Sequence, residues 1–275
     1  MQIARTQAEL DDAVAGLRER AARIGFVPTM GALHAGHRAL VDAARTADEG
    51  IVASIFVNPT QFGPNEDFSR YPRDEAGDLA LLREAGCGVV WMPDVATMYP
   101  PEMTTRIDVG GPSEGWEGTA RPGHFRGVAT VVTRLFGQVR PDRAYFGEKD
   151  WQQLQVVRRM VADLRLPVEV VGVPTVRDPD GLALSSRNRY LTDAERTRAP
   201  LLYASLREAA RNGATPAALA AARQRLTDAG MSVEYLELVD GPTLVRIEAP
   251  TRASGMRLIA AARLGSVRLL DNIDV

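Results

Sequence analysis

Two of the three histidines in this 275-residue chain, His34 and His37, lie three positions apart in a glycine-rich stretch. At the start of a helix this spacing places both imidazoles on one face. Gly36 between them removes a side chain, and a helix N-terminus offers unpaired N–H groups to phosphate. The spacing therefore predicts a phosphate cradle with two imidazoles. Zinc is disfavoured because only His124 remains as a third nitrogen ligand. A pair of partly exposed surface histidines is the other alternative.

Lys149 is the only lysine among 33 basic side chains, and it lies between Gly147 and Asp150. An ammonium is a compact charge that fits among phosphate oxygens, whereas a guanidinium is a broad planar fork. We therefore expect Lys149 to contact phosphate, the alternative being a solvated lysine retained by chance. The stretch 183–189, ALSSRNR, adds hydroxyls and guanidiniums of the kind that bind polyphosphate, although ordinary loops also contain such residues.

Short apolar runs alternate with amphipathic stretches through the first two thirds of the chain. The predicted buried strands are 24–29, 51–57, 88–92, 143–146 and 168–173. The predicted helices are 7–22, opened by the capping pair Thr6 and Glu9, then 36–48, 74–85, 125–139 and 150–163. This alternation indicates an α/β fold with a Rossmann-like, doubly wound parallel sheet. Ligands of such sheets bind beyond the carboxyl ends of the strands, where residues 29–37, 58–63 and 147–150 lie.

The pattern changes after about residue 186. Thr192 and Glu195 are a capping pair for a long helix, and Thr215 followed by Pro216 begins another. The runs 232–239, 256–263 and 266–273 alternate like antiparallel strands with one solvated face. We predict a Rossmann-like ligand-binding domain over 1–186 and a smaller C-terminal α+β domain over 187–275 that closes over the active site.

The composition narrows the class of protein. The 33 basic and 35 acidic side chains give a formal net charge of −2, which excludes a polybasic nucleic-acid binder or membrane-surface anchor. No apolar run approaches the roughly 20 residues of a membrane span. The single cysteine, Cys87, cannot form an intrachain disulfide. We expect a cytoplasmic protein with small-molecule ligands and neither nucleic-acid nor membrane partners.

Five segments carry a resemblance to a known family. They are PTMGALHAGH (28–37), FVNPTQFGPNEDFSRYPR (56–73), EGTARPGHFRGVATVV (117–132), YFGEKDWQQL (145–154) and DGLALSSRNRYL (180–191). In this order and spacing they are similar to the pantoate-beta-alanine ligases, members of the nucleotidyltransferase superfamily with a His-x-Gly-His motif. The resemblance implies condensation of (R)-pantoate with beta-alanine to pantothenate, through a pantoyl adenylate. ATP would supply AMP and pyrophosphate, in the biosynthesis of pantothenate and coenzyme A.

The resemblance also implies roles for particular residues. His37 would donate a proton or stabilise charge, and His34 and Lys149 would join it in catalysis. The residues implied to bind ATP are Met30, Gly31, Ala32, Leu33, His34, Ala35, Gly36, His37, Gly147, Glu148, Lys149, Asp150, Val176, Leu184, Ser185, Ser186 and Arg187. Gln61 and Gln153 match the positions that hold pantoate, and Gln61 would also serve beta-alanine. A carboxamide can bind a hydroxy acid while leaving its carboxylate nucleophilic, which a bidentate arginine would not.

Three further features concern the expected pantoate site in the first domain. Val128, Val131 and Val132 follow helical spacing and form either an apolar wall for the pantoate methyls or plain core. The loop 63–75 is either a lid, with Asn58 and Tyr71 as its active-site contacts, or an ordinary polar connection. His124 either caps its helix or takes part in catalysis.

The last expectations concern the metal cofactor, the oligomeric state and the alternative functions of the chain. The resemblance implies a homodimer and Mg²⁺ held chiefly by ATP phosphate oxygens and water, with direct protein ligands unknown. Another nucleotidyltransferase of the superfamily would explain the histidine turn but not Gln61, Gln153 or the RPGHF segment. A catalytically silent nucleotide-binding module or a tRNA-binding synthetase fragment would also use such a turn, but the net charge speaks against tRNA.

Overall fold

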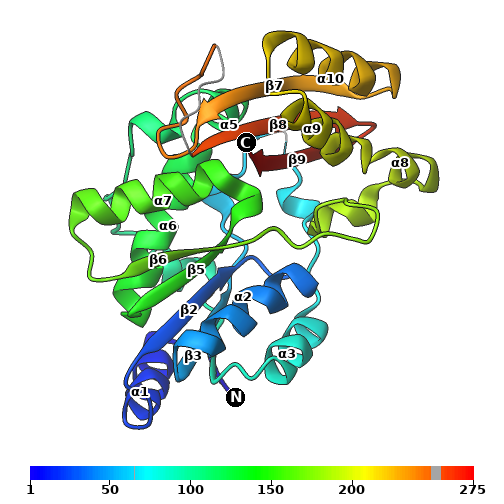
Figure 1. Ribbon diagram of the computed structural model, residues 1–275. Coiled ribbons are helices and arrows are strands. Elements are labelled where there is room, and N and C mark those ends of the chain that lie inside the picture. Colours follow the sequence, from blue (N-terminus) through cyan, green and yellow to red (C-terminus); the bar gives the residue numbers. More distant parts are fainter. Residues whose placement is uncertain (65, 249–254) are drawn as a thin grey trace. The chain divides into compact units, whose positions relative to one another are not determined.

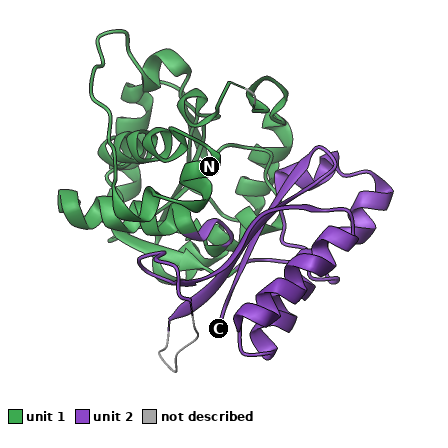
Figure 2. Ribbon diagram, turned by 90° about the horizontal axis from the view of Figure 1, so that it is seen from above, with its two compact units in different colours: residues 1–148, 152–174 green, residues 149–151, 175–275 purple. Residues whose placement is uncertain are grey.

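A computed structural model describes residues 1–64, 66–248 and 255–275 of the chain. The described residues form two compact units (Figure 2). The larger comprises Met1–Glu148 and Gln152–Pro174, and the smaller comprises Lys149–Trp151 and Thr175–Val275. The smaller unit thus begins at Thr175, ahead of the expected boundary at residue 186, and it also includes the turn that carries Lys149.

The larger unit is built on a six-stranded parallel sheet in the order β1-β4-β3-β2-β5-β6. Figure 1 labels β2, β3, β5 and β6 of this sheet. Its strands are β1 (Gln2–Ala4), β2 (Ile24–Thr29), β3 (Gly50–Ile55), β4 (Val89–Trp91), β5 (Arg143–Gly147) and β6 (Glu169–Val173). The central strands are apolar on both faces because helices cover both, and Ile24, Phe26 and Val27 of β2 are fully buried. The predicted doubly wound α/β sheet is confirmed.

The helices cover the two faces of this sheet (Figure 1). They are α1 (Gln7–Arg18), α2 (Ala35–Ala47), α3 (Glu75–Glu84), α4 (Val95–Met98), α5 (Trp116–Ala120), α6 (His124–Val139) and α7 (Trp151–Leu164). The α2 helix packs on β2, β3 and β5 beside α3, while α6 packs on β2 and α1. The Thr133 hydroxyl of α6 donates to Met160 Sδ of α7 at 3.0 Å. Parallel strands with helical crossovers therefore place the loops after β3, β2 and β5 along one edge.

The sequence missed some elements and misjudged one. Strand β1 has only three residues, too few to show a period. The helix expected to run on from Thr192 is interrupted, so that α8 (Asp193–Arg198) ends before Pro200 and α9 (Leu201–Arg211) follows. Pro200 lacks an N–H for the helical hydrogen bond, and its ring clashes with the preceding turn. The capping pairs at Thr6 and Thr192 are confirmed.

The smaller unit has an antiparallel sheet in the order β7-β8-β9, with β7 (Ser232–Asp240), β8 (Met256–Leu264) and β9 (Val267–Asp274). Together with α9 and α10 (Pro216–Asp228), these strands enclose a core that includes the buried side chains Leu206, Leu226, Leu236 and Leu258. The predicted smaller α+β fold is confirmed. Within the described ranges, no helix is both long and apolar enough to cross a membrane.

Candidate active site

His34 and His37 hold the first turn of α2 through a mutual cap. His34 Nδ1 accepts the Gly36 N–H at 3.1 Å, and His37 Nδ1 accepts the His34 N–H at 3.3 Å. The two ring centroids are 4.2 Å apart. Because each Nδ1 accepts a backbone N–H, the proton of each neutral ring lies on Nε2. The helix start therefore has two imidazole N–H donors beside the positive end of the helix dipole.

A strained turn joins β2 to this helix. Gly31 and Ala32 are both left-handed, with φ of 78° and 51°. The buried carboxylate of Asp78, on α3, accepts the Ala32 N–H at 2.9 Å and the Leu33 N–H at 2.6 Å. A Cβ at Gly31 would lie 2.9 Å from the same carboxylate, so glycine is required there. Asp78 thus holds the turn that carries Met30 to His37. Asp78 lies 46 residues from Ala32, so no local sequence pattern predicted this contact.

Asn58 and Gln61 form a buried amide cluster after β3. The Asn58 amide Nδ2 donates to Gln61 Oε1 at 3.1 Å and to the Gly127 carbonyl at 3.2 Å. Gln61 Nε2 donates to Met30 Sδ at 3.1 Å. A Cβ at Gly127 would lie 2.7 Å from Gln61 Cα, so only glycine lets α6 approach this turn. The cluster links the predicted pantoate position to the histidine turn through Met30.

His124, the first residue of α6, contacts the turn that carries Gln61. Its Nδ1–H donates to the Gln61 carbonyl at 2.9 Å, and its Nε2 accepts from Arg121, whose nitrogen is 3.1 Å away. Arg121 also pairs with Glu66 at 2.6 Å. Burial, followed by the Arg121 charge, lowers the pKa of His124 to about 4. This neutral ring contacts the Gln61 backbone and does not cap α6, whose N-cap residue is Gly123 without a side-chain hydrogen bond. A part for His124 in catalysis stays a prediction.

The loop 63–75 contains more structure than its sequence suggested. A 3₁₀ turn spans Phe68–Arg70, and the Phe62 ring packs edge-on against Phe68 and Tyr71, with centroids 5.4 and 5.8 Å away. Tyr71 is only 6% exposed. Residue 65 of the expected lid lies outside the described residues. The lid and a Tyr71 contact with substrate stay predictions.

Two adjacent glutamines on α7 differ in their surroundings. Gln152 is buried, accepts the Glu117 N–H at 2.9 Å and donates to the Pro112 carbonyl at 3.0 Å. Gln153, the predicted pantoate residue, is half-buried. Gln152 therefore anchors the 112–117 segment, whereas Gln153 is the more exposed residue of the two. Val131 and Val132 are 6% and 4% exposed on α6, consistent with either core or an apolar wall.

Lys149 belongs to the smaller unit, where the C-terminal sheet holds its backbone. The Asn272 amide of β9 donates to the Lys149 carbonyl at 2.8 Å. Two residues on, Trp151 Nε1 donates to the Gly241 carbonyl at 2.7 Å, and the Arg257 guanidinium lies 3.5 Å above the Trp151 ring. The Lys149 ammonium is 3.2 Å from Asp150. Asn272 lies 123 residues from Lys149, and Gly241 lies 90 residues from Trp151, so the local sequence gave no signal for these contacts.

The other predicted nucleotide residues of the smaller unit lie on a hairpin and the turn after it. The Leu184 N–H donates to the Val176 carbonyl at 3.0 Å. Ser185 caps the 3₁₀ turn Ser186–Tyr190 by accepting the Arg187 N–H at 3.3 Å. Lys149 and Ser185 line one pocket together with Asn188, Tyr203 and Arg268. The structure thus brings the lysine and one predicted hydroxyl to a common pocket.

The predicted site residues divide between the units. Those from Met30 to His37, with Asn58, Gln61, Tyr71, Val131, Val132, Gly147, Glu148 and Gln153, belong to the larger. Lys149, Asp150, Val176 and Leu184 to Arg187 belong to the smaller. Over the described part of the chain, no group of three or more His, Cys, Asp or Glu side chains is arranged to hold a metal ion.

Comparison with known proteins gives consistent matches along the chain. A family model described as pantoate-beta-alanine ligase matches residues 2–274. The pantothenate synthetase of Acidiphilium cryptum is 60% identical over 100% of both chains, and that of Rhodospirillum rubrum is 53% identical over 100% of this chain and 99% of its own.

Solved structures agree with these matches. The crystal structure of pantothenate synthetase from Thermus thermophilus has a TM-score of 0.93 and 52% identity, covering 100% of this chain and 99% of its own. A pantoate-beta-alanine ligase from Francisella tularensis, complexed with beta-gamma ATP and beta-alanine, has a TM-score of 0.84 and 33% identity, covering 100% and 97%. The chain belongs to the pantoate-beta-alanine ligase family.

Proposed function

We propose that this chain catalyses the ATP-dependent condensation of (R)-pantoate with beta-alanine to pantothenate, AMP and pyrophosphate. Family membership supports the reaction. The structural observation that carries the proposal is the 3.1 Å contact between Gln61 Nε2 and Met30 Sδ. It joins an amide cluster suited to a hydroxy acid to a histidine turn suited to a nucleotide.

In the first step, a pantoate carboxylate oxygen attacks the α-phosphorus of ATP. The bond from that phosphorus to the bridging oxygen breaks, and pyrophosphate leaves with the bonding electrons. Charge builds on the phosphate oxygens in this transition state, where preorganised donors are most effective. We assign that role to the Nε2–H groups of His34 and His37, which the mutual cap holds at the helix start.

In the second step, the unprotonated amine of beta-alanine attacks the acyl carbon of pantoyl adenylate. The amide bond forms, the bond from the acyl carbon to the AMP oxygen breaks, and the amine gives up one proton, which the released AMP phosphate can accept. The mixed anhydride must be kept from water during this exchange. We assign Gln61 to both acids, Gln153 to pantoate, and Val131 and Val132 to its methyl groups.

Residues of the smaller unit complete the proposal. Lys149, Ser185 and Arg187 suit the phosphates, because charged and hydroxyl donors bind phosphate oxygens strongly. Mg²⁺ would enter with ATP and neutralise its phosphates, bound by phosphate oxygens and water. Closure of the smaller domain over the active site, a homodimeric assembly and a cytoplasmic location remain part of the proposal.

The direct test supplies ATP, Mg²⁺ and pantoate with and without beta-alanine, and follows pyrophosphate, AMP and pantothenate. We expect AMP and pantothenate to appear together and to require beta-alanine. Sustained pyrophosphate release at the same rate with and without beta-alanine would favour another nucleotidyltransferase. ATP binding without turnover would favour a silent module, and either result would refute the proposal.

A further inference from the structure

We propose that Tyr99 is a positioning residue for the ligation: its hydroxyl helps to hold the Asn58 amide in place, and through Asn58 it keeps Gln61 Nε2 directed at the bound hydroxy acid. The inference rests on the proposed function, which supplies pantoate as the ligand of Gln61. Tyr99 follows α4 and lies 41 residues from Asn58. Its hydroxyl donates to Asn58 Oδ1 at 2.7 Å and lies 3.2 Å from Thr60 Oγ1.

Backbone groups of fixed polarity favour one orientation of the Asn58 amide, and the Tyr99 hydroxyl adds the shortest contact to its oxygen, at 2.7 Å. Asn58 Oδ1 accepts the Thr60 N–H at 3.2 Å, and Asn58 Nδ2 donates to the Gly127 carbonyl at 3.2 Å. In a reversed amide, Nδ2 would face the Thr60 N–H, and Oδ1 would face the Gly127 carbonyl, so neither hydrogen bond could form. The second Nδ2 hydrogen is donated to Gln61 Oε1. Since Asn58 is 1% exposed and both its N–H groups are used, it acts through Gln61.

The polarity of Gln61 follows from that of Asn58. With Oε1 occupied, Gln61 has Nε2 directed at Met30 Sδ. A thioether is a weak acceptor, so a carboxylate or hydroxyl of the substrate would readily replace it. If Gln61 reversed, its carbonyl oxygen would face the substrate carboxylate, and two acceptors would repel each other.

Tyr99 contributes what Thr60 cannot. The Thr60 hydroxyl also donates to Asn58 Oδ1, at 2.9 Å. Thr60 lies on the same short turn as Asn58 and Gln61, so it moves with them, whereas Tyr99 comes from a different element. The Tyr99 ring packs near Phe56, with centroids 6.1 Å apart, which fixes its hydroxyl. Burial raises the pKa of Tyr99, so the phenol keeps its proton and remains a donor.

The test is Tyr99→Phe, which retains the ring and removes the hydroxyl. Calorimetry on the full chain measures the binding of pantoate and of pantoamide, its carboxamide analogue. Losing one hydrogen bond should raise the pantoate Kd roughly fivefold. The pantoamide Kd should change less than twofold, because a carboxamide pairs with either end of a Gln61 that is held less firmly. The ATP Kd should not change.

Tyr145→Phe is the matched control, since it removes a buried tyrosine hydroxyl, bonded to Asp48 at 2.5 Å, at the opposite edge of the same sheet. It should leave the affinities for both pantoate and pantoamide unchanged. Equal weakening of pantoate and pantoamide by Tyr99→Phe, or no change in either, would overturn the inference. Failure of the proposed function is recognised separately, because the unmodified chain would then show no pantoate binding.

Discussion

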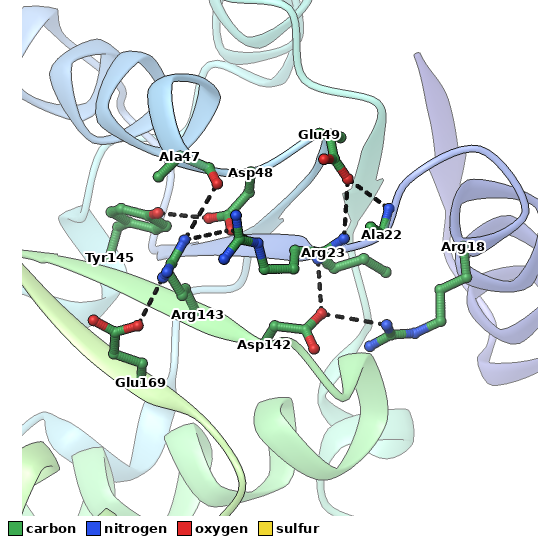
Figure 3. Close-up of polar contacts among 11 residues, drawn as sticks. Arg18, Ala22, Arg23, Ala47, Asp48, Glu49, Asp142, Arg143, Tyr145 and Glu169 are labelled. Carbon is green, nitrogen blue, oxygen red and sulfur yellow. Dashed lines mark hydrogen bonds and ion pairs between the residues drawn. The ribbon is translucent and has the colours of Figure 1, made fainter.

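The two edges of the parallel sheet use polar side chains in opposite ways. At the amino edge, charged groups neutralise one another (Figure 3). The buried Asp48 accepts from Tyr145 at 2.5 Å and Arg143 at 3.1 Å, and Arg143 also pairs with Glu169 at 2.7 Å. Asp142 accepts the backbone N–H of Ile24, the first residue of β2, at 2.8 Å. These contacts tie the starts of β2, β3, β5 and β6 together.

At the carboxyl edge, the groups that carry the proposed chemistry within the larger unit are two imidazoles and two carboxamides. A buried carboxylate at that edge, Asp78, accepts backbone N–H groups of the histidine turn. A ligand gains little from groups that already neutralise each other, whereas oriented neutral donors cost less to expose and still bind anions. The amino edge therefore joins its strands through ion pairs, whereas the groups proposed to bind ligand at the carboxyl edge are oriented dipoles, with the Arg121–Glu66 pair beside the Gln61 turn.

The largest expected effect tests the stabilising role of the amino edge. Asp48→Ala should lower the free energy of unfolding by about 4 kcal/mol, because it leaves the partly buried Arg143 and the Tyr145 hydroxyl without this partner. Denaturant titration measures the change. The rate of pantothenate formation should be unaffected at 25 °C. Asp11→Ala removes an exposed pair with Arg140 and should cost less than about 1 kcal/mol. Lost activity in folded Asp48→Ala would contradict the division between edges.

The next prediction concerns the imidazole donors. His37→Gln should slow pyrophosphate release roughly 10²-fold to 10³-fold, because a flexible amide replaces a fixed ring donor. Glutamine at the third helical position can still accept the His34 N–H, so the melting temperature should stay nearly constant. A melting temperature that falls together with the rate would instead assign His37 to helix stability.

The next prediction concerns how the free energy of unfolding depends on pH through His124, a buried neutral group at the carboxyl edge. Folded His124 has a pKa of about 4 against 6.5 for a free ring, so the unfolded chain binds more protons between these values. Its contribution is complete above pH 6.5 and is lost as the pH falls to 4, about 3 kcal/mol in all. His124→Asn retains a donor for the Gln61 carbonyl but cannot titrate. The difference in unfolding free energy between wild type and variant should change across this window, and a constant difference would refute it.

The smallest expected effect among these predictions concerns Lys149, which follows the carboxyl end of β5. Lys149→Arg should slow adenylation roughly tenfold, because a planar fork cannot reproduce a compact charge among phosphate oxygens. Rates of pyrophosphate release at saturating ATP measure it. Arg263→Lys, at an exposed pair with Glu234, is the control and should be neutral. A normal rate in Lys149→Arg would show that position needs only a positive charge.

Features that depend on neighbouring residues were predictable. The capping pair Thr6 and Glu9 marked the start of α1, and apolar runs located β2 to β6 within a few residues. The spacing of His34 and His37 indicated their shared place at a helix start. Strand β1 was not predicted because three residues are too few to show a period. The break at Pro200 was not predicted because the capping pair at Thr192 indicated a long helix.

The sequence by itself determined the alternating elements, the residue types for phosphate and hydroxy-acid chemistry, and the family resemblance. Only the tertiary structure decided how those residues are oriented and what supports them. Asp78, Tyr99 and Gly127 lie 41 to 69 residues from their partners, and Asn272 lies 123 residues from Lys149. Amide polarity and the lowered pKa of His124 depend on burial and on such distant groups, and these arise only when the chain folds.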